Sequence, residues 1–73
     1  MEENIRKFLM QGRKVYMGEC MDAFIDERLM EFDNDAEAIN FYADYEATAY
    51  AFYLDGDEVK RKIIYDPFAS FDY

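Results

Sequence analysis

Residues 31–46 read EFDNDAEAINFYADYE, a stretch that interleaves carboxylates with aromatic side chains and contains no basic residue. Within it, apolar residues recur at the spacing of an α-helix and would cover about half of its circumference. Any of Asp33, Asn34 or Asp35 could cap the start of that helix. We therefore expect a helix over residues 35–46 whose buried half consists of Ala36, Ala38, Ile39, Tyr42, Ala43 and Tyr45.

The same helical spacing places Glu37 and Asp44 on the opposite, exposed side. These two residues are seven positions apart, which is two turns or roughly 10 Å along a helix axis. Asn40 lies near the same line. The pattern thus predicts a row of negative charge held in place by the helix.

Residues further along the chain predict a β-hairpin. The segments 47–54, ATAYAFYL, and 58–65, EVKRKIIY, flank the dipeptide Asp55-Gly56, which is typical of a tight hairpin turn. Pro67 would end the second strand. With a two-residue turn we expect the cross-strand pairs Phe52–Val59, Tyr50–Arg61 and Thr48–Ile63.

The alternation within these strands divides the hairpin into two faces. We expect the face with the large apolar residues to be buried: Thr48, Tyr50, Phe52, Leu54, Val59, Ile63 and Tyr65. On the other face the aliphatic stems of Lys60 and Lys62 would lie over Ala49 and Ala51, with the ammonium groups in water.

The first third of the chain carries weaker patterns. Residues 2–11 predict a short helix with a stripe of Ile5, Phe8 and Leu9, ended by Gly12. Residues 13–17 are compatible with a brief strand. Residues 20–32 favour a helix, although their alternation also fits a strand.

A chain of 73 residues is long enough for one domain and too short for two. Its aromatic content of 19% argues for a folded protein rather than an acidic disordered tail. We therefore expect a single acidic α+β domain over residues 1–73, with two or three short helices and a C-terminal antiparallel β-hairpin.

The net charge of −9 is concentrated in the middle of the chain. Between Val15 and Glu58 there are thirteen acidic residues and one basic residue, Arg28. Such a field disfavours direct binding to nucleic acid or to an anionic membrane and favours a basic partner. The single Cys20 cannot form an intramolecular disulfide, and the first residues lack the features of a signal peptide, so we expect a cytoplasmic protein.

Several kinds of catalytic and metal site are excluded by composition. The chain has no histidine and only one cysteine, which rules out a histidine base, a histidine-bound zinc and a paired-cysteine redox site. Asp33, Asp35, Glu37 and Asp44 have the spacing of positions 1, 3, 5 and 12 of a calcium loop. Position 6, however, is Ala38 where that loop needs glycine, and position 12 is Asp rather than Glu. We expect a protein that is not an enzyme and has no cofactor or metal.

In size, acidity and aromatic content, and in the acidic stretches EFDNDAEAINFYADYE and DGDE at residues 55–58, the chain resembles the small DNA-mimic inhibitors encoded by bacteriophages. The resemblance implies an inhibitor that occupies the basic DNA-binding surface of a host protein, for example a histone-like nucleoid protein, in the host bacterial cytoplasm. The contact residues would be the clustered carboxylates: Glu31, Asp33, Asp35, Glu37, Asp44, Glu46, Asp55, Asp57 and Glu58.

An alternative class is a small acidic adaptor or assembly protein. In that case the specificity would lie in the aromatic residues of the C-terminal segment, Phe68, Phe71 and Tyr73, and the acidic residues would only keep the protein soluble. A homodimer formed through the same three residues is a further alternative.

Overall fold

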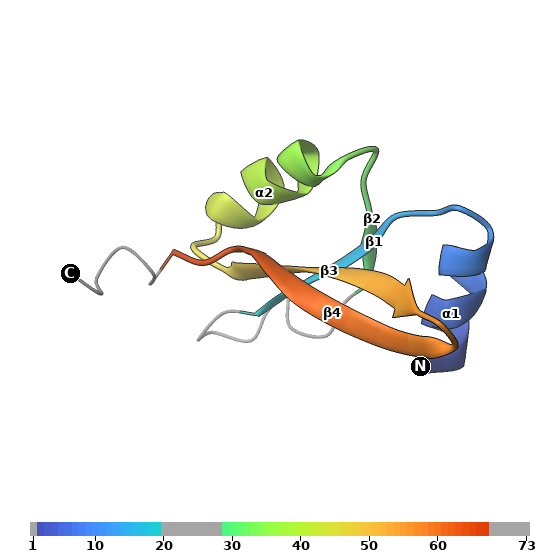
Figure 1. The fold of residues 1–73 in the computed structure, drawn as a ribbon. Coiled ribbons are helices and arrows are strands. Elements are labelled where there is room, and N and C mark those ends of the chain that lie inside the picture. Colours follow the sequence, from blue (N-terminus) through green and yellow to red (C-terminus); the bar gives the residue numbers. More distant parts are fainter. Residues whose placement is uncertain (1, 20–28, 68–73) are drawn as a thin grey trace.

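The structure, a computed structural model, describes residues 2–19 and 29–67 and shows an α+β fold in this part of the chain (Figure 1). The predicted class and the predicted C-terminal hairpin are therefore confirmed. Four antiparallel strands form one sheet in the order β2-β1-β3-β4. In chain order the elements are α1 (Glu2–Met10), β1 (Val15–Glu19), β2 (Met30–Glu31), α2 (Asp35–Ala43), β3 (Thr48–Asp55) and β4 (Glu58–Tyr65).

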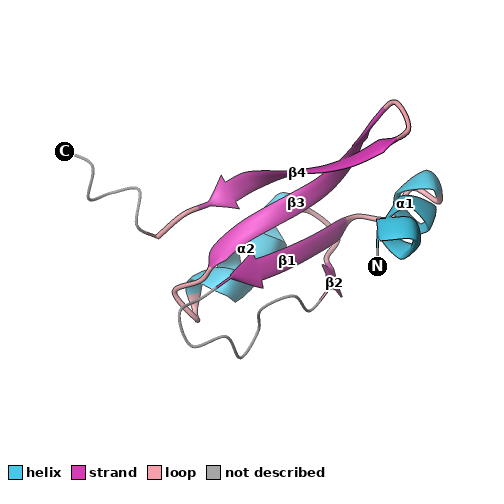
Figure 2. Ribbon diagram, turned by 90° about the horizontal axis from the view of Figure 1, so that it is seen from below, coloured by secondary structure: helices cyan, strands magenta, loops and turns pink. Residues whose placement is uncertain are grey.

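The two helices lie in different places relative to the sheet. Helix α2 covers one face, and Figure 2, which looks at the opposite face, shows α2 behind the strands. Helix α1 lies beside the end of the sheet that holds the β3–β4 turn (Figures 1 and 2). We call the two sides of the sheet the α2 face and the α1 face.

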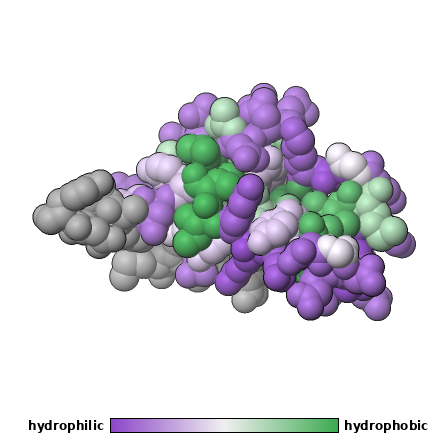
Figure 3. Space-filling model, viewed as in Figure 1, coloured by the Kyte–Doolittle hydropathy of each residue, from purple (hydrophilic) through white to green (hydrophobic). Residues whose placement is uncertain are grey.

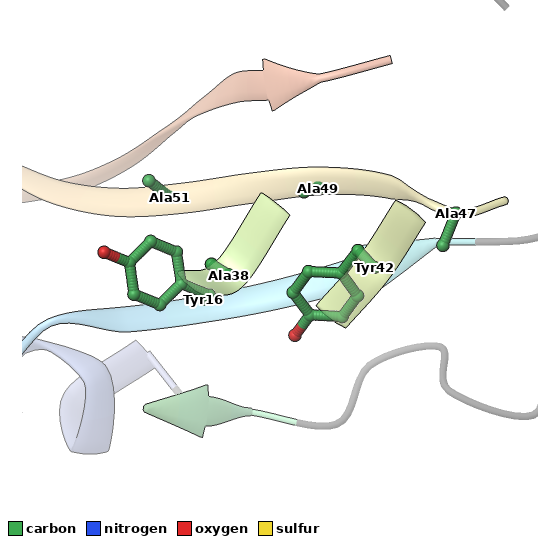
Figure 4. Close-up of a cluster of buried hydrophobic side chains, with 6 residues drawn as sticks. All are labelled: Tyr16, Ala38, Tyr42, Ala47, Ala49 and Ala51. Carbon is green, nitrogen blue, oxygen red and sulfur yellow. The ribbon is translucent and has the colours of Figure 1, made fainter. Parts of the chain in front are cut away.

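The core lies on the α2 face and is built around small residues of β3. Tyr16 and Tyr42 place their rings over a row of alanines (Figure 4), and both tyrosines are only 1% exposed. This arrangement contradicts our expectation that the alanine side of the hairpin would be the outer one. Small side chains allow α2 to approach the sheet closely, and the tyrosine rings fill the remaining space. The buried cluster consists of Tyr16, Ala38, Tyr42, Ala47, Ala49 and Ala51.

The face that we expected to form the core is less buried. Tyr50, Phe52 and Leu54 of β3 are half-buried, and Ile63 of β4 is 55% exposed. The prediction of which residues share this face is correct for β3, because Tyr50 pairs with Ile63 and Leu54 pairs with Val59. The prediction of which face is buried is wrong.

Gly18 of β1 is part of the close packing on the α2 face. It pairs with Ala49, and a Cβ atom at this position would lie 2.4 Å from Cδ1 and Cε1 of the Tyr42 ring. Any side chain would therefore displace the ring. Gly18 is thus a position where a helix side chain lies close to the sheet backbone.

The hairpin register differs from the predicted one by two residues. Asp55 pairs with Glu58, so the central residues of the turn are Gly56 and Asp57 rather than Asp55 and Gly56. Gly56 has a φ of +66°, as required at the first central position of a type II′ turn. The strands consequently pair Leu54–Val59, Phe52–Arg61 and Tyr50–Ile63.

A β-bulge also changes the end of the hairpin. The register shifts between Ala49 and Tyr50, because Ala49 pairs with Tyr65 and leaves Ile64 as the additional residue. Tyr65 therefore lies on the α2 face and packs, together with Ile64, against the buried cluster. Our placement of Tyr65 with Ile63 is wrong for this reason.

The other expectations from the sequence have mixed outcomes. Helix α1 and its stop at Gly12, which has a φ of +81°, are confirmed, and the predicted strand at 13–17 corresponds to β1. The helix predicted over 20–32 is wrong at residues 30–31, which form β2, while residues 20–28 lie outside the described residues. Cys20, Phe68, Phe71 and Tyr73 also lie outside them.

Helix α2 is shorter than the predicted helix because it ends at Ala43. Tyr45, expected in the buried half, is therefore in a turn and 53% exposed. Ala36, also expected in the buried half, lies in the first turn of α2 and is exposed. The remaining residues of the predicted buried half are buried or half-buried.

Candidate functional site

The start of α2 is fixed by two hydrogen bonds that both involve Glu37. Asn34 has an extended backbone and caps the helix, as its Oδ1 accepts a hydrogen bond from the N–H of Glu37 at 2.9 Å. The Glu37 carboxylate in turn accepts a hydrogen bond from the N–H of Asp33 at 3.3 Å. This resembles a capping box, in which two backbone donors are satisfied at once. Glu37 is held in place by it while its side chain remains exposed.

Asp35 connects the first turn of α2 to the sheet. Its Oδ1 accepts a hydrogen bond of 2.7 Å from the hydroxyl group of the buried Tyr16 in β1. Burial, together with this hydrogen bond to a carboxylate, raises the pKa of Tyr16 well above the ordinary value for tyrosine. The hydroxyl therefore stays protonated as the donor, and the position of the Asp35 carboxylate is set by the sheet.

Glu31 is different, because it is neutralised by Arg13. The guanidinium group makes a bidentate ion pair with Glu31, with 2.7 Å between Nε and Oε1 and a second contact between Nη2 and Oε2. This contact lowers the pKa of Glu31 and raises that of Arg13. The two charges offset each other at the surface, so Glu31 adds little to the net field of this region.

The end of α2 carries negative charge that no basic residue of its own last turn offsets. The last turn of the helix contains no basic residue, and Asp44 follows it directly as the C-terminal cap. The C-terminus of a helix already carries a partial negative charge, which basic side chains usually offset. Glu46 lies two residues further on, with a φ of +54° that reverses the chain toward β3.

The row predicted from helical spacing is present as a geometric feature. Glu37 and Asp44 are both exposed, and Asp44 keeps helical backbone angles although the helix proper ends one residue earlier. Asn40 between them is exposed as well. The outer side of α2 is mainly hydrophilic in the space-filling view (Figure 3).

The acidic residues of the hairpin turn form a separate group. They lie beside α1, at the opposite end of the sheet from the C-terminus of α2 (Figure 1). Lys60 pairs with Asp55 at 2.8 Å and with Glu58 at 3.9 Å, while Arg6 donates a hydrogen bond to the backbone carbonyl of Asp57 at 3.1 Å. The nine carboxylates identified from the sequence therefore do not form one cluster.

Five of the nine lie on α2 and its two flanks, and we call this set the α2 acidic surface. Its carboxylates have no basic partner among residues 2–19 and 29–67. Lys14 reaches this region, but its ammonium group donates to the backbone carbonyl of Asp33 at 3.1 Å. The surface consists of Asp33, Asp35, Glu37, Asp44 and Glu46.

Sequence reasoning missed Tyr16 and Arg13 as partners of these carboxylates. Tyr16 is 19 residues from Asp35, and Arg13 is 18 residues from Glu31. No local spacing pattern connects residues so far apart, because the contacts depend on the pairing of β1 with β2 and β3. The only related signal in the sequence was the brief strand expected at residues 13–17.

In residues 2–19 and 29–67, no three cysteine or acidic side chains come close enough together to hold a metal ion. Neither helix described by the structure has the length and apolar character needed to cross a membrane. Comparisons with protein-family models, with curated proteins and with solved structures find no match.

Proposed function

We propose that this protein is a DNA-mimic inhibitor. Its α2 acidic surface would occupy the basic DNA-binding surface of a nucleic-acid-binding protein, such as a histone-like nucleoid protein in a bacterial cytoplasm. The observation that carries the proposal is the placement of five carboxylates on one short helix and its two flanks, with no basic residue between them in the sequence.

The charge density of this surface is comparable to that of one DNA strand. The five carboxylates lie within the fourteen residues 33–46, which would span about 20 Å at the rise of a helix. One strand of B-DNA presents a phosphate every 3.4 Å along the axis, or roughly six phosphates over that length. Five carboxylates on α2 and its flanks therefore offer a basic groove a similar number of negative groups.

The rigid attachment of these groups also supports mimicry. Asp35 is held by Tyr16, Glu37 is held by the helix cap, and the helix packs on a buried cluster of alanines and tyrosines. Because these two carboxylates are positioned before binding, less conformational entropy is lost when a partner is bound. Flexible acidic side chains on a disordered tail would lack this advantage.

The proposal is tested by competition with DNA. The protein is first used to capture partners from a bacterial lysate at low and at high salt, and a captured DNA-binding protein is then bound to labelled duplex DNA. The parent protein is expected to displace the DNA, more strongly at low salt. The double variant Glu37→Gln, Asp44→Asn is expected to need about tenfold more protein for the same displacement, since it loses two charges from the contact surface.

A control variant with the same change in net charge isolates the position of the charge. Glu2→Gln, Glu3→Gln removes two carboxylates from α1, outside the α2 acidic surface. This control is expected to compete nearly as well as the parent. If both double variants lose the same amount, only net charge matters, and the proposed contact surface is wrong.

The adaptor alternative predicts the opposite pattern. Replacing Phe68 and Phe71 with Ala would abolish capture of the partner, whereas the variant Glu37→Gln, Asp44→Asn would bind and compete like the parent. That combination of results would replace mimicry with recognition through aromatic residues.

A further inference from the structure

An open groove lies on the α1 face, between α1 and the hairpin. Its cavity volume is about 580 Å³, which is within the range of protein binding sites. The lining is mainly apolar and comes from four elements, and Lys60, Arg61 and Glu2 complete it. Its apolar residues are Ile5, Met17, Phe52 and Val59.

Arg61 differs from the other two arginines described by the structure. Its guanidinium group lies over the ring of Tyr50 at 4.3 Å and donates from Nη1 to the sulfur atom of Met17 at 3.3 Å. Arg6 and Arg13 pair with carboxylates, but Arg61 has no carboxylate partner within residues 2–19 and 29–67. A guanidinium group has five N–H donors, and a thioether is a weak acceptor. Arg61 is thus held in a defined position with most of its donors available.

On the α1 face, the side chains of β4 alternate between apolar and cationic. Val59, Arg61 and Ile63 share this face, so apolar, cationic and apolar groups follow one another at a spacing of about 7 Å. Ile63 extends the apolar surface beyond the groove and is 55% exposed. Side chains of an extended polypeptide that point the same way have the same spacing.

From this complementarity we propose that the α1 face binds an extended segment of a partner protein in which an acidic residue lies between two apolar residues, each two positions away. The carboxylate would pair with Arg61, one apolar side chain would enter the groove at Val59, and the other would cover Ile63. This contact lies on the opposite side of the sheet from the α2 acidic surface and is independent of the proposed function. The α2 acidic surface does not prevent it, because interactions between exposed charges more than roughly 8 Å apart are largely screened at physiological ionic strength.

The test uses two synthetic peptides that differ at one residue. The first is acetylated and amidated leucine-threonine-aspartate-threonine-leucine, and the second has lysine in place of aspartate. In an NMR titration of the full chain, the aspartate peptide is expected to shift the backbone amides of Met17 and of residues 59–63. It is expected to bind about tenfold more tightly than the lysine peptide, as for a hydrogen-bonded charge pair.

Neighbouring residues on opposite sides of β4 provide matched variants. Arg61→Gln is expected to remove the preference for the aspartate peptide, whereas Lys62→Gln, on the α2 face, is expected to preserve it. Equal binding of the two peptides, equal effects of the two variants, or amide shifts confined to α2 would each overturn the proposal. Self-association of the chain without peptide that shifts the amides of residues 59–63 would also overturn it, since the occupant would then be a second copy.

Discussion

The two faces of the sheet show two different solutions to covering a β-sheet. On the α2 face, small residues of the strands allow a helix to lie close, and Tyr16 and Tyr42 fill the space almost completely. On the α1 face, the strands carry larger side chains such as Phe52 and Tyr50, yet these remain half-buried. The face with the less hydrophobic strands is therefore the better buried one.

The difference teaches that closeness of approach, not strand hydrophobicity, determines which face becomes the core. A tyrosine from a helix buries most of its ring only if the opposing strand offers room. Ala49, Ala51 and Gly18 offer this room on the α2 face. On the α1 face the helix lies at one end of the sheet, and the groove beside it stays open.

The largest effect is expected where the α2 face is most tightly packed. In the variant Gly18→Ala, the new methyl group would overlap the Tyr42 ring at 2.4 Å. Overpacking of this kind is expected to lower the free energy of unfolding by about 2 to 3 kcal/mol. That is a large part of the roughly 3 to 5 kcal/mol that a core of this size supplies. Urea unfolding followed by circular dichroism measures the loss.

A second variant shows whether the loss arises from the Tyr42 ring. Tyr42→Leu removes the atoms that the methyl group would meet, so the double variant Gly18→Ala, Tyr42→Leu should be more stable than the sum of the two single effects predicts. If the effects simply add, the close packing of α2 on β1 is not the reason for the glycine.

Local patterns in the sequence were sufficient for much of the fold. Helical spacing identified α2 and the exposure of Glu37 and Asp44, and the glycine-containing turn identified the hairpin. The turn register was wrong because Gly56 can serve as either central residue of a two-residue turn, and only the strand pairing shows that it is the first. Strand β2 has only two residues, too few for any periodic pattern.

Less of the candidate site than of the fold could be predicted from the sequence. Its carboxylates could be identified because they are sequence neighbours, but their effective charge could not, since neutralisation depends on residues far along the chain. Glu31, for example, is paired with Arg13, which is 18 residues away. The buried face was missed because the small size of Ala49 is an advantage only when a helix lies above it.

The hydroxyl groups of the two buried tyrosines provide a second, smaller comparison within the α2 face. Tyr16 donates a hydrogen bond to Asp35, so Tyr16→Phe is expected to cost about 1 kcal/mol. The hydroxyl of Tyr42 is buried without a partner among the described residues, and burial raises the pKa of Tyr42 to about 12. Tyr42→Phe removes an unsatisfied polar group and is expected to stabilise the protein by about 1 kcal/mol. Thermal unfolding of both variants distinguishes the signs, and a loss of stability in both would show that the Tyr42 hydroxyl is bonded.

The smallest effect concerns the two ends of α2, where a negative charge should raise the stability of the protein at one end and lower it at the other. Glu37 lies in the first turn, near the positive end of the helix dipole, and it completes the cap. Asp44 lies at the negative end, with no basic residue in the last turn. Glu37→Gln is therefore expected to destabilise the protein by about 0.3 to 0.5 kcal/mol, and Asp44→Asn to stabilise it by a similar amount.

These opposite signs make the double variant a fair probe of binding, because its stability should be close to that of the parent. Urea unfolding of the two single variants at low ionic strength measures each effect, and both should shrink as salt screens the dipole. If Asp44→Asn stabilises the protein and also weakens its competition with DNA, the Asp44 carboxylate contributes to binding although it lowers the stability of α2. If Asp44→Asn lowers stability instead, Asp44 has a structural role at the end of α2, and weaker competition by the double variant could not be assigned to lost contacts alone.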